Sequence, residues 1–235
     1  MQSILGKLKE RKNKVYVFTG AGMSTESGLP DFRSGTGIWR KFDPLQLATV
    51  KAMENNYEAF HEFYSLRLTQ GALVKPNQGH EILAEWEARG LVQGIITQNV
   101  DDLHRMAGSK NISELHGRLD AIRCMACDTK AESQDFLAKK PCEQCGEKLR
   151  PGVVLFGENL PINALVQAES WAREANVFIV LGSSLQVSPA NQLPQISKQN
   201  NSFLILCNRD ETLLDYLFDV VSHDEIGKFL KELNF

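Results

Sequence analysis

Two pairs of cysteines carry the strongest chemical signal in this 235-residue chain. Two residues separate the members of each pair, Cys124 with Cys127 and Cys142 with Cys145, and fourteen residues lie between the pairs. This short spacing turns both thiolates of a pair toward one ion, and two such pairs complete a tetrahedron. We therefore expect one structural zinc ion whose four positions are all filled by thiolates. A redox Cys-x-x-Cys is the alternative, but that motif is usually single and begins a helix.

A glycine-rich turn follows the first apolar run of the chain. The run 14–19 leads into Gly20, Ala21 and Gly22, with Ser24 shortly after. Glycine lets backbone N–H groups approach a pyrophosphate, and a following helix N-terminus favours its negative charge. The next glycine comes only at position 28, so the spacing departs from the usual G-x-G-x-x-G. A nucleotide-phosphate cradle is one interpretation, and a simple tight turn is the other.

Polar residues that can bind a ligand follow three further apolar runs. Gln98, Asn99 and Asp101 come directly after the run 92–97. The other groups of this kind are Gly182, Ser183 and Ser184 after the run 177–182, and Asn208 after the run 202–207. Because the carboxyl ends of parallel strands meet at one edge of a sheet, we expect these groups to face a ligand there. Asp101 can in addition cap a helix over 102–107.

His116 is the candidate general base. It lies in the segment Glu114-Leu115-His116-Gly117, immediately before the cysteine pairs. An imidazole with a pKa near 6.5 can accept a proton at neutral pH, as a general base must. Histidines are more often structural, and we expect that role for the other four, which are His61, His80, His104 and His223.

These motifs resemble, in type and order, those of the sirtuins. The motifs are the glycine turn, Gln98-Asn99-Val100-Asp101, Leu115-His116-Gly117, the two cysteine pairs and Leu181-Gly182-Ser183-Ser184. The resemblance extends from about Val15 to the C-terminal helix. It implies an NAD-dependent protein-lysine deacylase whose partners are acylated lysine side chains of proteins. The products are then nicotinamide, O-acyl-ADP-ribose and free lysine.

The resemblance also implies how NAD is bound. The glycine turn, from Gly20 through Ala21 and Gly22 to Ser24, lines the pyrophosphate. Asp31-Phe32-Arg33 resembles the mobile cofactor loop of the family, in which Phe32 shields the reactive ribose from water and Arg33 pairs with phosphate. A turn that buries a phenylalanine is the simpler interpretation of that tripeptide.

The remaining cofactor residues fall at the ends of the predicted strands. By resemblance, Asn99 and Asp101, next to Gln98, recognise the nicotinamide carboxamide and the adjoining ribose. Gly182, Ser183 and Ser184 contact ribose and phosphate, and Asn208 binds the adenine ribose. His116 takes a proton from a ribose hydroxyl.

The segment 153–158 resembles the strand that binds the peptide substrate in sirtuins. An extended peptide can add to an exposed strand edge through backbone hydrogen bonds. Val154 and Phe156 then line the lysine tunnel, and Gly157 and Glu158 end the segment with polar groups. An ordinary core strand is the alternative.

Three residues suggest an acidic acyl group. Ala48, Tyr64 and Arg67 resemble the small residue and the Tyr-x-x-Arg pair of sirtuins that remove succinyl, malonyl or glutaryl chains. Tyr64 and Arg67 are one helical turn apart and so share one face of a helix. A phenol and a guanidinium can hold a carboxylate through charge-assisted contacts, typically worth about 1.5–3 kcal/mol. The alternative is a solvated Arg67 beside a tyrosine at the edge of the core.

The composition argues against a nucleic-acid-binding, a membrane and a secreted protein. The chain is 43% hydrophobic and 23% charged with a net charge of −3, which is ordinary for a globular protein and gives no global attraction to nucleic acid or anionic membrane. No apolar run approaches the roughly 20 residues that span a bilayer, and the N-terminus lacks a signal-peptide core. We expect a cytoplasmic protein. Cys207, within an apolar run, is expected to be an inert buried thiol.

Apolar runs of strand length alternate with helical patterns over 78–90, 101–107 and 161–174. This alternation predicts an α/β fold with a doubly wound parallel sheet. We expect a Rossmann-like NAD-binding domain of 1–42, 76–120 and 151–235. A smaller inserted domain then combines a helical module, 43–75, with a zinc-ribbon module, 121–150. The helical module is expected to expose a partly aromatic face with Phe60, Phe63 and Tyr64, and purely structural helices are the alternative.

Other functions remain open at this point. A plain deacetylase lacks the acidic-acyl preference, and a protein mono-ADP-ribosyltransferase shares the cofactor and the first bond cleavage. A non-catalytic reader of acylated lysine needs no base, so the set of Asn99, Asp101 and His116 argues against it. A nucleic-acid-binding zinc ribbon is disfavoured by the acidic balance and by the few aromatic residues near the cysteines.

Overall fold

The computed structural model describes residues 14–30 and 44–233, so the predicted cofactor loop Asp31-Phe32-Arg33 lies outside the described residues. Six parallel strands form the main sheet in the order β3-β2-β1-β6-β7-β8. They are β1 Val15–Thr19, β2 Gly94–Thr97, β3 Ile112–Glu114, β6 Val177–Leu181, β7 Phe203–Cys207 and β8 Val220–Ser222. The chain reverses direction across the sheet between β1 and β6, which confirms the predicted doubly wound α/β fold.

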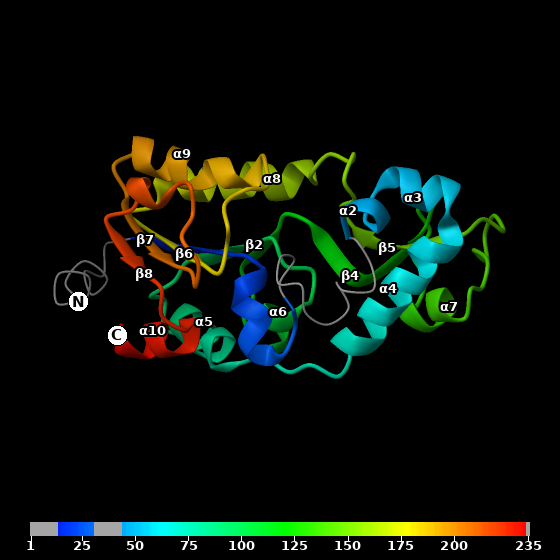
Figure 1. Ribbon diagram of the computed structural model, residues 1–235, viewed down its shortest axis with the longest axis horizontal. Coiled ribbons are helices and arrows are strands. Elements are labelled where there is room, and N and C mark those ends of the chain that lie inside the picture. Colours follow the sequence, from blue (N-terminus) through cyan, green and yellow to red (C-terminus); the bar gives the residue numbers. More distant parts are fainter. Residues whose placement is uncertain (1–13, 31–43, 234–235) are drawn as a thin grey trace.

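Helices cover both faces of this sheet, which is why its central strands β1 and β6 are buried throughout. On one face lie α5 (Gln78–Ala88) and α10 (Ile226–Glu232), and on the other lie α8 (Ile162–Glu174) and α9 (Leu193–Gln199) (Figure 1). All five residues of β1 are buried between these two layers. Cys207 is fully buried at the end of β7, as expected.

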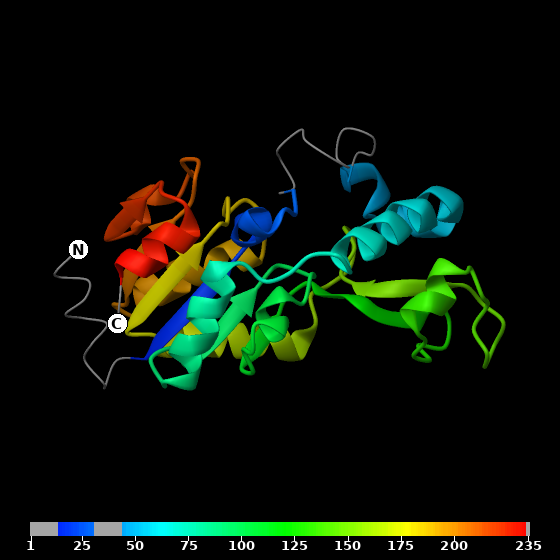
Figure 2. The same ribbon diagram turned by 90° about the horizontal axis from the view of Figure 1, so that it is seen from below.

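A second core lies at the other end of the molecule (Figure 2). Its elements are α2 (Pro44–Leu47), α3 (Val50–Asn55), α4 (Tyr57–Gly71), α7 (Ser133–Leu137) and the antiparallel pair β4 (Gly117–Cys124) and β5 (Leu149–Val153). The expectation of an exposed aromatic face on 43–75 is wrong. Phe60, Phe63 and Tyr64 are at most 1% exposed, because α4 packs this face against the β4–β5 pair and α7.

Several boundaries differ from the sequence-based expectation. The β4–β5 pair extends beyond 121–150 at both ends, and the assignment of domains stays a prediction. The short helix α6 spans only Leu103–Met106, because Asp102 adopts a left-handed φ of 62° just before it. The shortest strands, β3 and β8, were not anticipated. The described ranges also contain the 3₁₀ turns η1 (Ala21–Ser27), η3 (Ala190–Gln192) and η4 (Asp215–Leu217).

In the part of the chain that the structure describes, no helix is both long enough and apolar enough to cross a bilayer.

Candidate active site and metal centre

The glycine turn after β1 packs directly on the turn after β6. The Gly20 N–H donates to the Leu181 carbonyl at 3.0 Å, and the Gly22 N–H donates to the Gly182 carbonyl at 2.9 Å. A Cβ on Gly22 would lie 2.7 Å from Gly182 Cα, and one on Gly182, at a φ of 61°, would lie 2.4 Å from Met23 N. Close approach of two backbones therefore requires these glycines. The Gly22 N–H is thus engaged within the protein rather than directed at a phosphate.

Ser24, Asn99 and Asp101 form one hydrogen-bonded cluster. The Ser24 hydroxyl donates to Asp101 Oδ2 at 2.6 Å and accepts from the Asn99 side-chain amide at 3.1 Å. The other Asp101 oxygen accepts from the Leu103 N–H at 3.0 Å, although the N-cap position of α6 is Asp102 rather than the predicted Asp101. Burial raises the pKa of Asp101, and the bonds from Ser24 and Leu103 oppose that shift. Ser24 therefore belongs with the polar residues after β2 as well as with the glycine turn.

Gln98 connects His116 to the turn after β6. The Gln98 carbonyl lies 3.0 Å from His116 Nδ1, and its side-chain Oε1 accepts from the Ser183 hydroxyl at 2.9 Å. A carbonyl only accepts hydrogen bonds, so Nδ1 carries the proton and Nε2 keeps its lone pair. Burial lowers the pKa of His116, and the bond to Gln98 opposes this effect. The half-buried imidazole is thereby neutral with an available base nitrogen.

Two more predicted cofactor residues lie at strand ends, as expected. Ser184 is half-buried just beyond β6. Asn208 follows β7, where its N–H donates to the Ser222 carbonyl at 3.0 Å and its side-chain amide donates to the Asp210 carbonyl at 2.7 Å. The Asn208 side chain is thus oriented by its own turn.

The predicted substrate segment is mostly not a strand. β5 ends at Val153, and beyond it Phe156 alone makes a parallel bridge, to Thr49. The Phe156 N–H donates to the Ala48 carbonyl and its carbonyl accepts from the Val50 N–H, so this backbone is already paired within the protein. The Phe156 side chain is 45% exposed. The half-buried Val154 donates its N–H to the His116 carbonyl at 2.9 Å, which ties the segment to the base.

Gly157 and Glu158 shape the end of this segment. Gly157 has a φ of 99°, which favours glycine. Both carboxylate oxygens of Glu158 accept from the Arg150 guanidinium, at 2.5 and 2.9 Å. Arg150 is 5% exposed and also donates to the Val153 carbonyl at 2.8 Å. The Glu158 carboxylate is therefore used internally, and sequence reasoning missed Arg150.

Ala48, Tyr64 and Arg67 belong to the elements that form the second core. Ala48 and Tyr64 belong to the same buried cluster, with Tyr64 1% exposed. The guanidinium carbon of Arg67 lies 5.6 Å from the Tyr64 ring centroid and 5.7 Å from that of Phe63. Burial raises the pKa of Tyr64 to about 12 and lowers that of Arg67. The Asp101 carboxylate favours the charged form of Arg67, which relates this side chain electrostatically to the Ser24–Asn99–Asp101 cluster.

The four cysteines of the two pairs converge, as predicted. Their sulfur atoms all lie within 4.8 Å of one another, with Sγ–Sγ distances of 3.4 Å for Cys124–Cys145 and 3.6 Å for Cys127–Cys142. A tetrahedral site with Zn–S bonds of about 2.3 Å places its sulfurs about 3.8 Å apart. The Ala126 and Cys127 N–H groups point at the Cys124 sulfur. The cluster fits a structural zinc ion and not a single redox pair.

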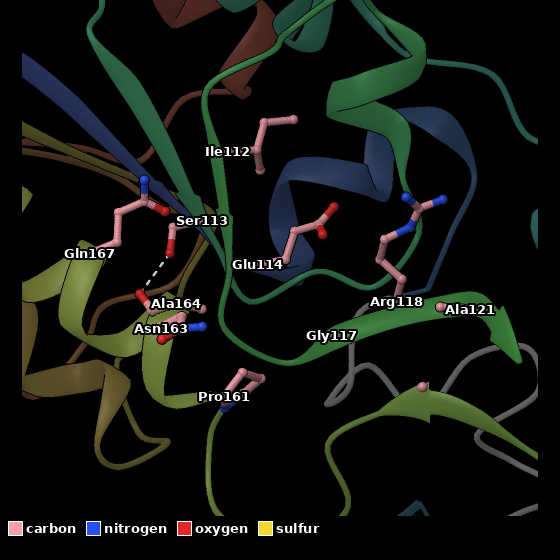
Figure 3. Close-up of a pocket in the computed structure, with 11 residues that line it drawn as sticks. Ile112, Ser113, Glu114, Gly117, Arg118, Ala121, Pro161, Asn163, Ala164 and Gln167 are labelled. Carbon is pink, nitrogen blue, oxygen red and sulfur yellow. Dashed lines mark hydrogen bonds between the residues drawn. The ribbon is translucent and has the colours of Figure 1, made fainter. Parts of the chain in front are cut away.

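A separate hollow of about 410 Å³ lies beside the segment that carries His116 (Figure 3). Glu114 and Gly117, on either side of Leu115-His116, line it together with Arg118 and with Asn163 at the start of α8. Among the residues that the structure describes, none of those predicted for cofactor, substrate or metal lines this hollow. The predicted cofactor residues Ser24, Asn99 and Ser183 instead follow the carboxyl ends of β1, β2 and β6.

This geometry can be compared with known proteins. The model of the Sir2 family matches residues 20–189, which is more than half of the chain. The chain belongs to the Sir2 family. The predicted resemblance is thereby confirmed at the level of the family. NAD-dependent protein deacetylase 1 of Geobacillus kaustophilus is 51% identical to this sirtuin over 220 residues, which are 93% of this chain and 91% of the relative.

Solved structures of Sir2 proteins have the same fold as this chain over nearly its whole length. A Sir2 protein with a deacetylated p53 peptide and 3'-O-acetyl ADP ribose is 35% identical with a TM-score of 0.93, covering 99% of this sirtuin and 96% of that chain. A Sir2 homologue in complex with NAD is 38% identical with a TM-score of 0.92, covering 99% and 92%. The predicted Rossmann-like fold is confirmed.

Proposed function

We propose that this sirtuin removes acyl groups from lysine side chains of proteins, and that its substrates include succinyl- or malonyl-lysine besides acetyl-lysine. The NAD-dependent deacylase activity follows from family membership, with NAD consumed as co-substrate. The finer acyl range rests on Ala48, Tyr64 and Arg67. We place the enzyme in the cytoplasm, where a reducing environment keeps the zinc-site cysteines as thiolates.

The observation that carries the proposal is the polar network at the carboxyl edge of the sheet. It joins Ser24, Asn99 and Asp101 to one another, and Gln98 to both His116 and Ser183. A sheet of this topology binds its ligand outside this edge. Amide and carboxylate side chains can hydrogen-bond the nicotinamide carboxamide and the adjoining ribose. The turn after β6 can offer its hydroxyl and N–H groups to the other ribose and the phosphates of NAD.

When bound, NAD would supply a ribose carbon that bonds to the acyl oxygen of the substrate as the bond from this carbon to nicotinamide breaks and nicotinamide leaves. The protein's part is to orient both substrates and to move a proton. Gln98 fixes the proton of His116 on Nδ1, so Nε2 accepts the proton of a ribose hydroxyl. Because burial keeps this imidazole neutral, the base is ready at pH 7. Asn99 and Asp101, held by Ser24, orient the nicotinamide end.

The proposed range of acyl groups depends on Arg67, a charged residue beside the aromatic side chains of α4. Tyr64 is buried among the aromatic side chains of α4, and Arg67 lies one turn further along the same helix. A guanidinium in such surroundings has lost part of its hydration, and a carboxylate of the substrate compensates this loss. Ala48, with its small side chain, leaves space for a four-carbon acyl chain. Acetyl-lysine needs no such partner and is accepted as well.

The experiment compares nicotinamide release with acetyl- and succinyl-lysine versions of one peptide. We expect both to react with the wild type, and Arg67→Met to lower kcat/KM for the succinyl peptide at least tenfold more than for the acetyl peptide, as for one lost charge-assisted contact. Arg173→Met is the matched control, because Arg173 is an exposed arginine of α8 paired with Glu169. Equal effects of Arg67→Met on both peptides refute the acidic-acyl preference and leave a plain deacetylase.

A further inference from the structure

Two buried histidines lie behind the proposed nicotinamide site without taking part in the chemistry. His80 on α5 is fully buried and His104 on α6 is 3% exposed. Their ring centroids are 4.8 Å apart, with the ring planes tilted by 59°. Among the residues that the structure describes, one nitrogen of each ring has no hydrogen-bond partner, Nε2 of His80 and Nδ1 of His104. Such groups are costly in a protein interior, and an apolar side chain fills the same space at lower cost.

The hydrogen bonds of His80 define where its proton lies. At the start of α5, the Asn77 N–H donates to His80 Nδ1 at 3.3 Å, while Asn77 Oδ1 accepts from the His80 N–H at the same distance. Nδ1 therefore carries a lone pair, and the ring proton of the neutral imidazole is on Nε2. Burial lowers the pKa values of both histidines, that of His80 to about 4.

His104 connects the histidine pair to two threonine hydroxyls at the carboxyl edge of the sheet. Its Nε2 lies 3.0 Å from the Thr19 hydroxyl, which lies 2.8 Å from the Thr97 hydroxyl. Because the Thr19 hydroxyl gives its one proton to Thr97, it can only accept from His104, so Nε2 of His104 carries the ring proton and Nδ1 the lone pair. His104 Nε2–H then donates to Thr19, and Thr19 donates to Thr97.

This series of hydrogen bonds, from His104 through Thr19 and Thr97, ends at the backbone N–H of Asn99, a proposed NAD-binding residue. The Asn99 N–H donates to the Thr97 hydroxyl at 3.0 Å, and the Asn99 side chain donates to Ser24. His104 also lines a hollow of about 10 Å³, the size of one water molecule, together with Asn99 and Asp101. His104 is thus adjacent to both polar groups proposed to orient nicotinamide.

We propose that His104, whose tautomer is set by its contact with Thr19, is a positioning residue that acts through Thr19 and Thr97 to hold Asn99 against the nicotinamide end of NAD. This inference rests on the proposed role of Asn99. A merely structural histidine pair contributes to folding, whereas this one governs how tightly the nicotinamide group is held.

The test removes one hydroxyl and keeps the shape of the side chain. In the full-length enzyme, Thr97→Val is expected to raise KM for NAD and the inhibition constant of nicotinamide about tenfold, the effect of one lost hydrogen bond at a buried site. Binding of the acetyl peptide alone, measured by calorimetry, is expected to change less than twofold. Ser113→Ala is the matched control, because its buried hydroxyl on β3 bonds to the Ala164 carbonyl, outside this chain of bonds.

Variants at His104 separate positioning from folding. Glutamine places an N–H near the position of Nε2, so His104→Gln is expected to retain nicotinamide inhibition within about threefold of wild type, whereas His104→Leu loses about tenfold. Equal nicotinamide inhibition in Thr97→Val, His104→Leu and the wild type overturns the inference. The same holds if His104→Gln is impaired as strongly as His104→Leu at equal melting temperature.

An Asn99→Ala variant shows which claim has failed. If it weakens nicotinamide inhibition while Thr97→Val does not, the positioning role is wrong and the proposed NAD site stands. If Asn99→Ala itself has no effect, the role of Asn99 is wrong and the inference falls with it.

Discussion

His116 Nδ1 lies 3.0 Å from the main-chain carbonyl oxygen of Gln98. This contact determines the chemistry of the ring, because the neutral imidazole must place its proton on Nδ1 and leave Nε2 as the base. The side chain of the same glutamine is held by Ser183 at the end of β6. Two strand ends of the parallel sheet therefore fix the protonation pattern of the proposed general base.

The first prediction concerns pH. Burial lowers the pKa of His116, and a base acts in its neutral form. Activity should therefore fall only on the acid side of the ordinary histidine pKa, about 6.5, and remain level through neutral pH. The measurement is kcat/KM for an acetyl peptide from about pH 5 to 9. An acid limb with its midpoint above the ordinary histidine value contradicts the lowered pKa.

The second prediction concerns the metal. Elemental analysis should find one zinc per chain, because four thiolates complete the site. Cys127→Ser should lose zinc and lower the melting temperature by about 10 °C, since the cluster joins the β4–β5 pair to the loop that follows α7. Cys207→Ala, which removes the thiol outside the cluster, should keep its zinc. Purified wild type without zinc contradicts the assignment.

The third prediction concerns the Arg150–Glu158 pair. Burial alone raises the pKa of Glu158, but the bonds from Arg150 and from the Leu155 N–H outweigh it, and the net shift is downward. Glu158→Gln leaves the buried guanidinium without its counter-charge and should lower the free energy of unfolding by about 2–3 kcal/mol in urea titrations.

Two further variants make this prediction specific. The double variant Arg150→Met/Glu158→Gln should recover part of the loss, because no uncompensated charge remains buried. Glu85→Gln, in the exposed pair with Arg89, should cost less than about 0.5 kcal/mol. A Glu158→Gln protein as stable as wild type shows that the pair has no role in holding the segment.

Much of the fold could be predicted because its signals are local. The four long apolar runs became β1, β2, β6 and β7 within two residues of their expected limits. The strands β3 and β8 have only three residues each and no apolar run to mark them. The burial of Phe60 and Phe63 could not be predicted, because part of their cover, in α7 and the β4–β5 pair, comes from residues more than 45 positions further along the chain.

The candidate site, too, combines residues that the sequence could identify with contacts that it could not. Spacing identified the four cysteines and the polar residues at strand ends, since ligand geometry and sheet topology dictate both. Glu158 was predicted to end the substrate segment with a polar group, but its pairing with Arg150 has no signature in the sequence. The bonds that join Thr19, Thr97 and His104 cross 78 and 85 positions of sequence and leave no pattern in it.

The most direct test of the central claim is a mass-spectrometric measurement of O-acetyl-ADP-ribose from an acetyl-lysine peptide and NAD, for wild type and His116→Ala. The wild type should form this product, and the variant should form it at least about 100-fold more slowly, with unchanged zinc content and melting temperature. A variant as active as wild type contradicts the assignment of His116. ADP-ribose attached to protein, with no O-acetyl-ADP-ribose from wild type, contradicts the deacylase function itself and identifies a transferase.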